Sequence, residues 1–100
     1  MKILIINGAN LNLLGRRQPE IYGHESFEDL LEALRARYSE HTIDHFQSNI
    51  EGELVDALQR AEGIYDGVVL NAGGYTHTSV VLRDAIAAIS VAVVEVHKSS

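Results

Sequence analysis

Apolar residues recur along the chain in four short runs rich in Val and Ile. The runs cover Ile3 to Ile6, Thr42 to Phe46, Val68 to Leu70 and Val91 to Val96, and the second run alternates apolar with polar residues. Runs of this length and composition predict β-strands, and the continuous ones are typical of strands buried on both faces. We therefore expect a small sheet with a largely apolar interior.

Between these runs, apolar positions repeat with the spacing of an α-helix. The predicted helices span Ser26 to Tyr38, Gly52 to Ala61 and Thr78 to Ile89, and Ser26 with Asp29 resembles a capping box at the start of the first. Strands that alternate with helices indicate parallel pairing through right-handed crossovers. The pattern predicts a doubly wound α/β sheet.

A long polar interruption follows the first predicted strand. Residues Asn7 to Gly23 contain several amides, two arginines, a tyrosine, a proline and three glycines. A strand-to-helix connection needs only a few residues, and a longer ordered loop is usually functional. We expect this loop to form part of a site.

Polar side chains also follow the other predicted strands at their carboxyl ends. Asn7 and Asn10 follow the first strand, and the stretch from Asn71 to His77 follows the third. The fourth run carries Glu95 and ends on His97. Doubly wound sheets bind ligands at the carboxyl ends of their strands, so these residues predict a site at that edge.

Composition narrows the class of protein. The 100 residues suit one domain, and 46% of them are hydrophobic, which is typical of a globular chain. The net charge of −6 would repel a phosphate backbone, so we expect no nucleic-acid partner. No apolar run approaches a membrane span, and no cleavable leader precedes the first strand, so we expect a cytoplasmic protein without membrane contact. The chain contains no cysteine, which excludes thiol chemistry.

Several kinds of chemistry lack their sequence motif. There is no G-x-G-x-x-G and no P-loop, and Lys2 and Lys98 lie at the extremities of the chain, so nucleotide, flavin and Schiff-base chemistry are disfavoured. His77 and His97 have no clustered carboxylate or cysteine partner with metal-ligand spacing. No G-x-S-x-G is present for a serine nucleophile. We therefore expect neither cofactor nor metal.

Acid and base chemistry remains. A phenol has an ordinary pKa of about 10, but a guanidinium beside it favours the phenolate, which makes Tyr22 with Arg17 a candidate base. His97, oriented by Glu95, is a candidate acid, and Asn10 is placed to hold a water or to donate to an enolate oxygen. Such a set suits elimination of water next to a carbonyl.

Each of these residues also has a structural explanation. A loop tyrosine such as Tyr22 is commonly a packing residue, and adjacent arginines are commonly solvated. His77 precedes Thr78 and Ser79, either of which suits a helix cap. His77 is therefore equally well explained as a polar loop residue before the helix. His97 reads equally as a hydrogen-bonded structural histidine.

Four stretches together closely resemble type II 3-dehydroquinate dehydratase. They cover residues 7–23, 47–54, 70–79 and 94–97, and the likeness extends over essentially the whole chain. The resemblance implies a flavodoxin-like fold with strand order 2-1-3-4 and a fifth strand that this chain lacks. It also implies a lyase without cofactor, which reversibly trans-dehydrates 3-dehydroquinate to 3-dehydroshikimate through an enolate, in the shikimate pathway or in quinate breakdown.

The resemblance assigns catalytic roles to residues of this chain. Tyr22 matches the base that removes the proton beside the ketone, and Arg17 matches the residue that keeps the base ionised. His97 matches the acid that protonates the departing hydroxyl, with Glu95 orienting it. Asn10 matches the residue that steadies the enolate through a water.

The resemblance also assigns binding roles. Asn71 and His77 match residues that bind substrate hydroxyls, and Ser99 lies where backbone amides take the substrate carboxylate. Asp84 matches a residue that reaches a neighbouring subunit's site in a homododecamer built of trimers. The expected partners are therefore the small-molecule substrate and further copies of the chain.

The chain departs from the family pattern in places. Ala9 and Ala92 stand where proline is usual, and residues 97–100 differ from the usual sequence. Family members continue through a further arginine, a fifth strand and a terminal helix. We therefore expect residues 1–100 to be a single, C-terminally incomplete domain, less stable and less active than a full-length member. The alternative function is a non-catalytic flavodoxin-like module for ligand binding or assembly.

Overall fold

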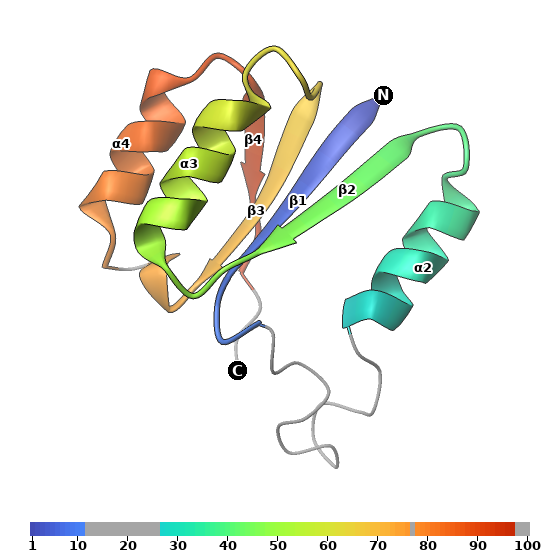
Figure 1. Cartoon of the computed structure of the whole chain (residues 1–100), viewed down its shortest axis with the longest axis horizontal. Helices are drawn as coiled ribbons and strands as arrows, with labels where there is room; N and C mark the ends of the chain where they lie inside the picture. The colour runs from blue at the N-terminus through green and yellow to red at the C-terminus, as the bar shows by residue number, and fades with distance from the viewer. Residues whose placement is uncertain (12–26, 77, 98–100) are drawn as a thin grey trace.

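A four-stranded parallel sheet forms the centre of the molecule. The computed structural model describes residues 1–11, 27–76 and 78–97. The strands pair in the order β2-β1-β3-β4, which confirms the predicted doubly wound sheet and its strand order (Figure 1). Their bounds are Lys2–Ala9 for β1, Thr42–Gln47 for β2, Gly67–Gly73 for β3 and Ala92–Glu95 for β4.

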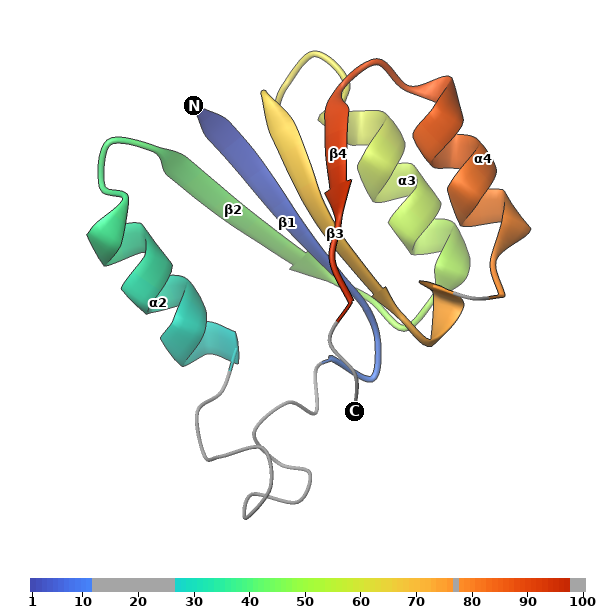
Figure 2. The same ribbon diagram turned by 180° about the vertical axis from the view of Figure 1, so that it is seen from behind.

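Helices flank this sheet on both faces. Helices α3 and α4 lie side by side over one face, whereas α2 lies beside β2 on the opposite side (Figures 1 and 2). The helical elements are α2 (Phe27–Arg37), α3 (Glu51–Ala61), the short 3₁₀ helix η2 (Gly74–Thr76) and α4 (Val80–Ala88).

The N-cap residue Ser79 sets the start of helix α4 at Val80. The Leu82 backbone N–H donates to the Ser79 hydroxyl oxygen at 2.9 Å, so Ser79 is the N-cap and the predicted start at Thr78 lies two residues too early. The helix ends at Ala88, one residue before the predicted end. The predicted cap of the first helix involves Ser26, which lies outside the described residues.

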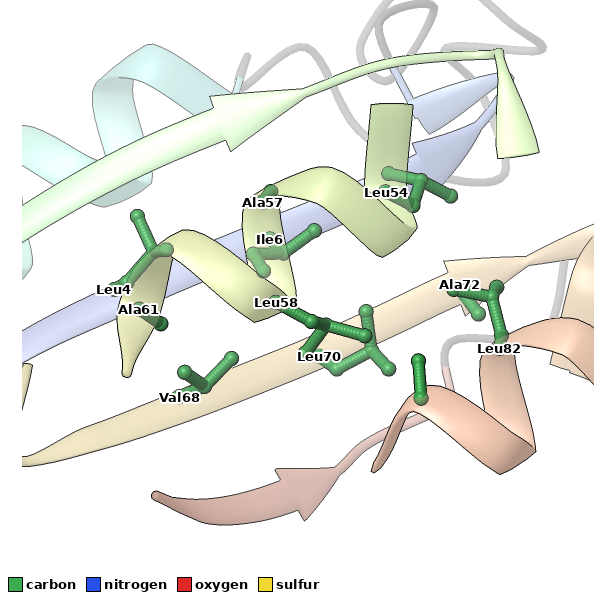
Figure 3. Close-up of a cluster of buried hydrophobic side chains, with 11 residues drawn as sticks. Leu4, Ile6, Leu54, Ala57, Leu58, Ala61, Val68, Leu70, Ala72 and Leu82 are labelled. Carbon is green, nitrogen blue, oxygen red and sulfur yellow. The ribbon is translucent and has the colours of Figure 1, made fainter. Parts of the chain in front are cut away.

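The apolar core lies between the sheet and helices α3 and α4. Alternate residues of β1 and β3 point toward these helices, as the strand geometry requires (Figure 3). Ile6 of β1 and Leu54 and Leu58 of α3 have no exposed surface. The remaining members of the cluster are Leu4, Ala57, Ala61, Val68, Leu70, Ala72, Leu82 and Ala85.

The apolar runs predicted strands that are buried on both faces. This prediction is wrong for the face of the sheet that lies away from α3 and α4. There Ile5 and Val69 are only partly buried, and Val94 of β4 is 60% exposed. These residues are exposed because α2 covers only the β2 side of this face, and no described helix covers β3 and β4 there (Figure 2). A continuous apolar run therefore overstated how much of β4 is buried.

Candidate functional site

The carboxyl ends of the strands meet at one edge of the sheet, and the predicted site residues come from that edge (Figure 1). Asn10 directly follows β1, and Asn71 lies near the end of β3. Glu95 is the last residue of β4, and His97 follows two residues later. The structure thus brings these four residues to the common edge that the sequence predicted.

Other predicted site residues lie outside the described part of the chain. These are Arg17, Tyr22, His77 and Ser99. Their expected roles stay predictions.

Asn10 adopts a backbone conformation that few residues tolerate. Its φ of 69° lies in the left-handed region, where asparagine is enriched among non-glycine residues. Its backbone N–H donates to the Asn49 side-chain oxygen at 2.9 Å. The same oxygen accepts a bond from Gln47 Nε2 at 3.2 Å. Asn49 therefore ties the chain after β1 to the turn after β2.

The end of β2 and the turn after it have further bonds to β1 and to η2. The Ser48 N–H donates to the Asn7 carbonyl at 3.0 Å, and Gln47 Nε2 donates to the Gly8 carbonyl at 3.2 Å. The Tyr75 hydroxyl donates to the Asn49 carbonyl at 2.8 Å. The end of β2 therefore supports the edge, although the site residues predicted from the strand ends all follow the other three strands. Applying the carboxyl-end rule to Gln47 and Asn49 would have found it.

Asn71 is a buried amide at the end of β3. Only 8% of it is exposed, and its side-chain oxygen accepts the Gly73 N–H at 3.2 Å. Gly73 has a φ of 63°, which a side-chain-free residue adopts readily. This local turn uses the Asn71 oxygen and leaves the amide NH₂ as the group suited to donate to a ligand.

The end of β4 carries the predicted acid. The Val96 N–H still donates to the Leu70 carbonyl at 2.8 Å, so the chain keeps its pairing with β3 just beyond the strand. Glu95 and His97 flank Val96, and both are exposed. Because side chains two residues apart on an extended chain share a side, this arrangement is compatible with Glu95 orienting His97.

Asp84 lies away from the strand edge, on the exposed surface of α4. It lines a hollow of about 340 Å³ near the start of that helix. The wall of the hollow also contains Arg83, whose Nη2 donates to the Thr76 carbonyl at 3.3 Å. Asp84 is therefore exposed in this chain, and its predicted role at a neighbouring subunit stays a prediction.

A histidine without a predicted functional role, His45, lies beside the edge. His45 of β2 is partly buried, and its Nε2 lies 3.1 Å from Nδ2 of the buried Asn7. Burial is the main cause that lowers the pKa of His45 from its ordinary value. The contact joins residues 38 positions apart, so no local pattern indicates it.

Two other kinds of feature are absent from the part of the chain that the structure describes. In residues 1–11, 27–76 and 78–97, no group of three or more His, Cys, Asp or Glu side chains is arranged to hold a metal ion. None of the helices that the structure describes has the length and apolar character needed to cross a membrane.

The parallel order β2-β1-β3-β4 defines a flavodoxin-like α/β protein, and sheets of this kind bind their ligands at the carboxyl edge, where the polar groups lie. The sequence model described as dehydroquinase class II matches residues 1–100. The chain therefore belongs to the class II dehydroquinase family, which confirms the resemblance.

Curated relatives agree with this family. The chain is 54% identical to 3-dehydroquinate dehydratase 1 of Corynebacterium efficiens over 101 residues, covering 99% of this chain and 67% of the relative. It is 50% identical to 3-dehydroquinate dehydratase of Synechococcus sp. strain CC9605 over 102 residues, covering 100% of this chain and 70% of the relative.

Solved structures share the fold. The type II dehydroquinase from Butyrivibrio crossotus superposes with a TM-score of 0.89 at 43% identity, covering all of this chain and 72% of its own. The type II dehydroquinase from Propionibacterium acnes gives a TM-score of 0.84 at 31% identity, covering 96% of this chain and 68% of its own.

Proposed function

We propose that this chain is a 3-dehydroquinate dehydratase, a lyase that converts 3-dehydroquinate reversibly to 3-dehydroshikimate and water. Family membership and the names of the relatives support the reaction. The observation that carries the proposal is the common edge, where Asn10, Asn71 and His97 come from three different strands. The reaction belongs to the shikimate pathway or to quinate breakdown.

Tyr22 is the base in this proposal. Its phenolate takes the proton from the carbon beside the ketone, and the electron pair of the C–H bond moves to form the enolate. Arg17 stabilises the phenolate by its positive charge. No cofactor is needed, because proton transfer alone drives each step.

His97 completes the elimination as the acid. The enolate re-forms the carbonyl, the new double bond forms, and the departing hydroxyl takes a proton from His97 and leaves as water. Glu95 orients the imidazole. Asn10, held by Asn49, positions a water that donates to the enolate oxygen.

The remaining residues bind substrate and partner copies. Asn71 and His77 hold substrate hydroxyls, and the backbone at Ser99 binds the carboxylate. Asp84 reaches the site of a neighbouring copy in a homododecamer built of trimers, for which its outward position on α4 is support. We also propose that residues 1–100 act as one domain and that the protein works in the cytoplasm.

Turnover of 3-dehydroquinate tests the proposal. Product formation is followed by the ultraviolet absorbance of the conjugated enone. We expect Tyr22→Phe to lower kcat by about 10²- to 10⁴-fold, the range for a lost general base, because the phenyl ring has no proton-accepting oxygen.

Tyr38→Phe is the matched control, since Tyr38 is a 41% exposed tyrosine just after α2. It should leave kcat within about two-fold of the parent, as expected for an exposed side chain. Equal losses in the two variants would contradict the role of Tyr22. Binding of a substrate analogue without any turnover would favour the binding module instead.

A further inference from the structure

Three carboxamide side chains form a row across the candidate site. Asn7 of β1 is the register partner of Gln47 on β2 and of Asn71 on β3. Register partners on neighbouring strands point to the same face, so the three amides are adjacent. Asn7 at the centre is 5% exposed. The orientation of its amide therefore decides whether an acceptor or a donor stands beside Asn71.

His45 makes the contact that fixes the orientation of the Asn7 amide. It lies two residues before Gln47 on β2, so it shares the face of the amide row. Its Nε2 is 3.1 Å from Asn7 Nδ2. The Phe27 ring at the start of α2 packs against the imidazole with centroids 4.4 Å apart. The ring is thus clamped between the helix and the sheet.

The contact specifies the charge and tautomer of His45. An amide nitrogen only donates, so the imidazole Nε2 must accept, and the ring is neutral with its proton on Nδ1. A protonated ring has only donors. It would require the Asn7 oxygen to face it, which means a half-turn of the amide. The protonation state of His45 and the orientation of Asn7 are therefore linked.

The groups around His45 favour the neutral ring. Burial is the largest cause that lowers the pKa of His45. On α2, the Arg35 charge also lowers the pKa, whereas Glu28 raises it. On β1, the neighbours Ile5 and Asn7 carry no charge. The ring is therefore neutral near pH 7 and becomes charged only on acidification.

We infer that His45 is a positioning residue for the dehydratase site, because its neutral ring holds the Asn7 amide with the oxygen directed away from β2. This inference rests on the proposed function for its effect on turnover, but not for the linkage itself. Acidification reverses the amide and replaces the acceptor by a donor. At low pH the site thereby loses one acceptor for the O–H proton of a substrate hydroxyl.

Nuclear magnetic resonance tests the linkage without any turnover. The ¹⁵N shifts of the imidazole should show the Nδ1–H tautomer of His45 at neutral pH. The side-chain NH₂ signals of Asn7 should then move with the titration of His45 and not with that of His41, which lies before the other end of β2. An Nε2–H tautomer, or Asn7 signals that ignore the His45 titration, would overturn the inference.

Kinetics test the positioning role. His45→Gln retains an acceptor that does not titrate, so the acid limb of the kcat/KM profile should lose one ionisation. His45→Phe keeps the ring but removes the acceptor, and kcat/KM should fall about three- to ten-fold, as for one lost hydrogen bond.

His41→Gln is the control and should keep the parent profile. An unchanged acid limb in His45→Gln would refute the positioning role. If neither the parent nor any variant turns over 3-dehydroquinate, this result contradicts the proposed function and not the linkage. The resonance experiment still decides the linkage in that case.

Discussion

At the scale of single residues, two glycines set how closely β1 and β3 approach at the candidate site. A Cβ on Gly8 would lie 2.3 Å from the Ala72 carbonyl oxygen. A Cβ on Gly73 would lie 2.5 Å from the Ala9 carbonyl oxygen, and this residue also has a φ of 63°. Because the atoms met are backbone, neither contact is relieved by rotating a side chain.

We expect Gly8→Ala to lower the free energy of unfolding by about 1–3 kcal/mol, the usual cost of overpacking. Gly52→Ala on α3 is the control, because a Cβ there meets nothing within 4 Å. That change should be neutral or stabilise by up to about 1 kcal/mol. Urea unfolding followed by circular dichroism measures both. Equal midpoints for the two variants would argue against the close approach.

A site residue could be predicted from the sequence where it follows directly on a single predicted strand. Asn10 and Asn71 follow apolar runs, so the carboxyl-end rule places them at the edge. The pair of Asn7 and His45 was not predictable, because it depends on how β2 lies against β1. Pairing between strands far apart in sequence leaves no local pattern.

At the scale of elements, a carboxylate joins the end of α3 to the turn before β4. Glu62 accepts the Ser90 N–H at 2.7 Å and the Val91 N–H at 3.2 Å. The Ser90 hydroxyl also donates to it, at 2.9 Å. The Ser90 backbone bond is the first of the causes that lower the pKa of Glu62. The ionised form is therefore the one that holds the turn.

The contribution of Glu62 to the stability of the fold therefore depends on pH. Since the folded-state pKa of Glu62 lies below the unfolded value, its contribution to stability is present above the unfolded pKa. That contribution is lost as the pH falls through the folded pKa. We expect the urea midpoint of the parent to decline between about pH 5 and pH 3, and Glu62→Gln to remove part of this decline.

Glu32→Gln on the exposed surface of α2 is the matched control. It should keep the parent's decline. If Glu62→Gln is offset from the parent by the same amount at both ends of the pH range, the carboxylate does not hold the turn by its charge.

Element type and order followed from the sequence, whereas element extent did not. Each predicted strand and helix is present, because periodicity reports which face is apolar. Strand β1 runs on to Ala9, beyond the apolar run, because pairing with β3 continues there. Strand β4 is shorter than its apolar run, at Ala92–Glu95.

At the scale of the whole molecule, the two faces of the sheet are covered unequally. Helices α3 and α4 bury one face, while the other keeps an apolar hollow of about 220 Å³ that includes Ile3, Ile5 and Val69. Val94 is the register partner of Val69 and is 60% exposed. In the described part of the chain, this face is therefore a contiguous apolar surface.

Such a surface should bind an environment-sensitive hydrophobic dye. We expect Val94→Lys to reduce dye fluorescence while changing the free energy of unfolding by no more than about 0.5 kcal/mol, because the side chain is exposed. Val80→Lys on α4 is the control, at a valine that is 80% exposed on the other side. A larger loss of fluorescence in the control would show that the dye binds elsewhere.

The central position of β1 has a consequence for synthesis. This strand is synthesised before β3, the strand with which it pairs, and β3 ends only at Gly73. Leu4 and Ile6 therefore lack these neighbours until residues 67–73 have been synthesised. A nascent chain paused before residue 67 exposes these side chains to chaperones and proteases. Between the synthesis of β1 and that of β3, these apolar side chains lack the strand that packs beside them, and exposed apolar surface of this kind favours aggregation.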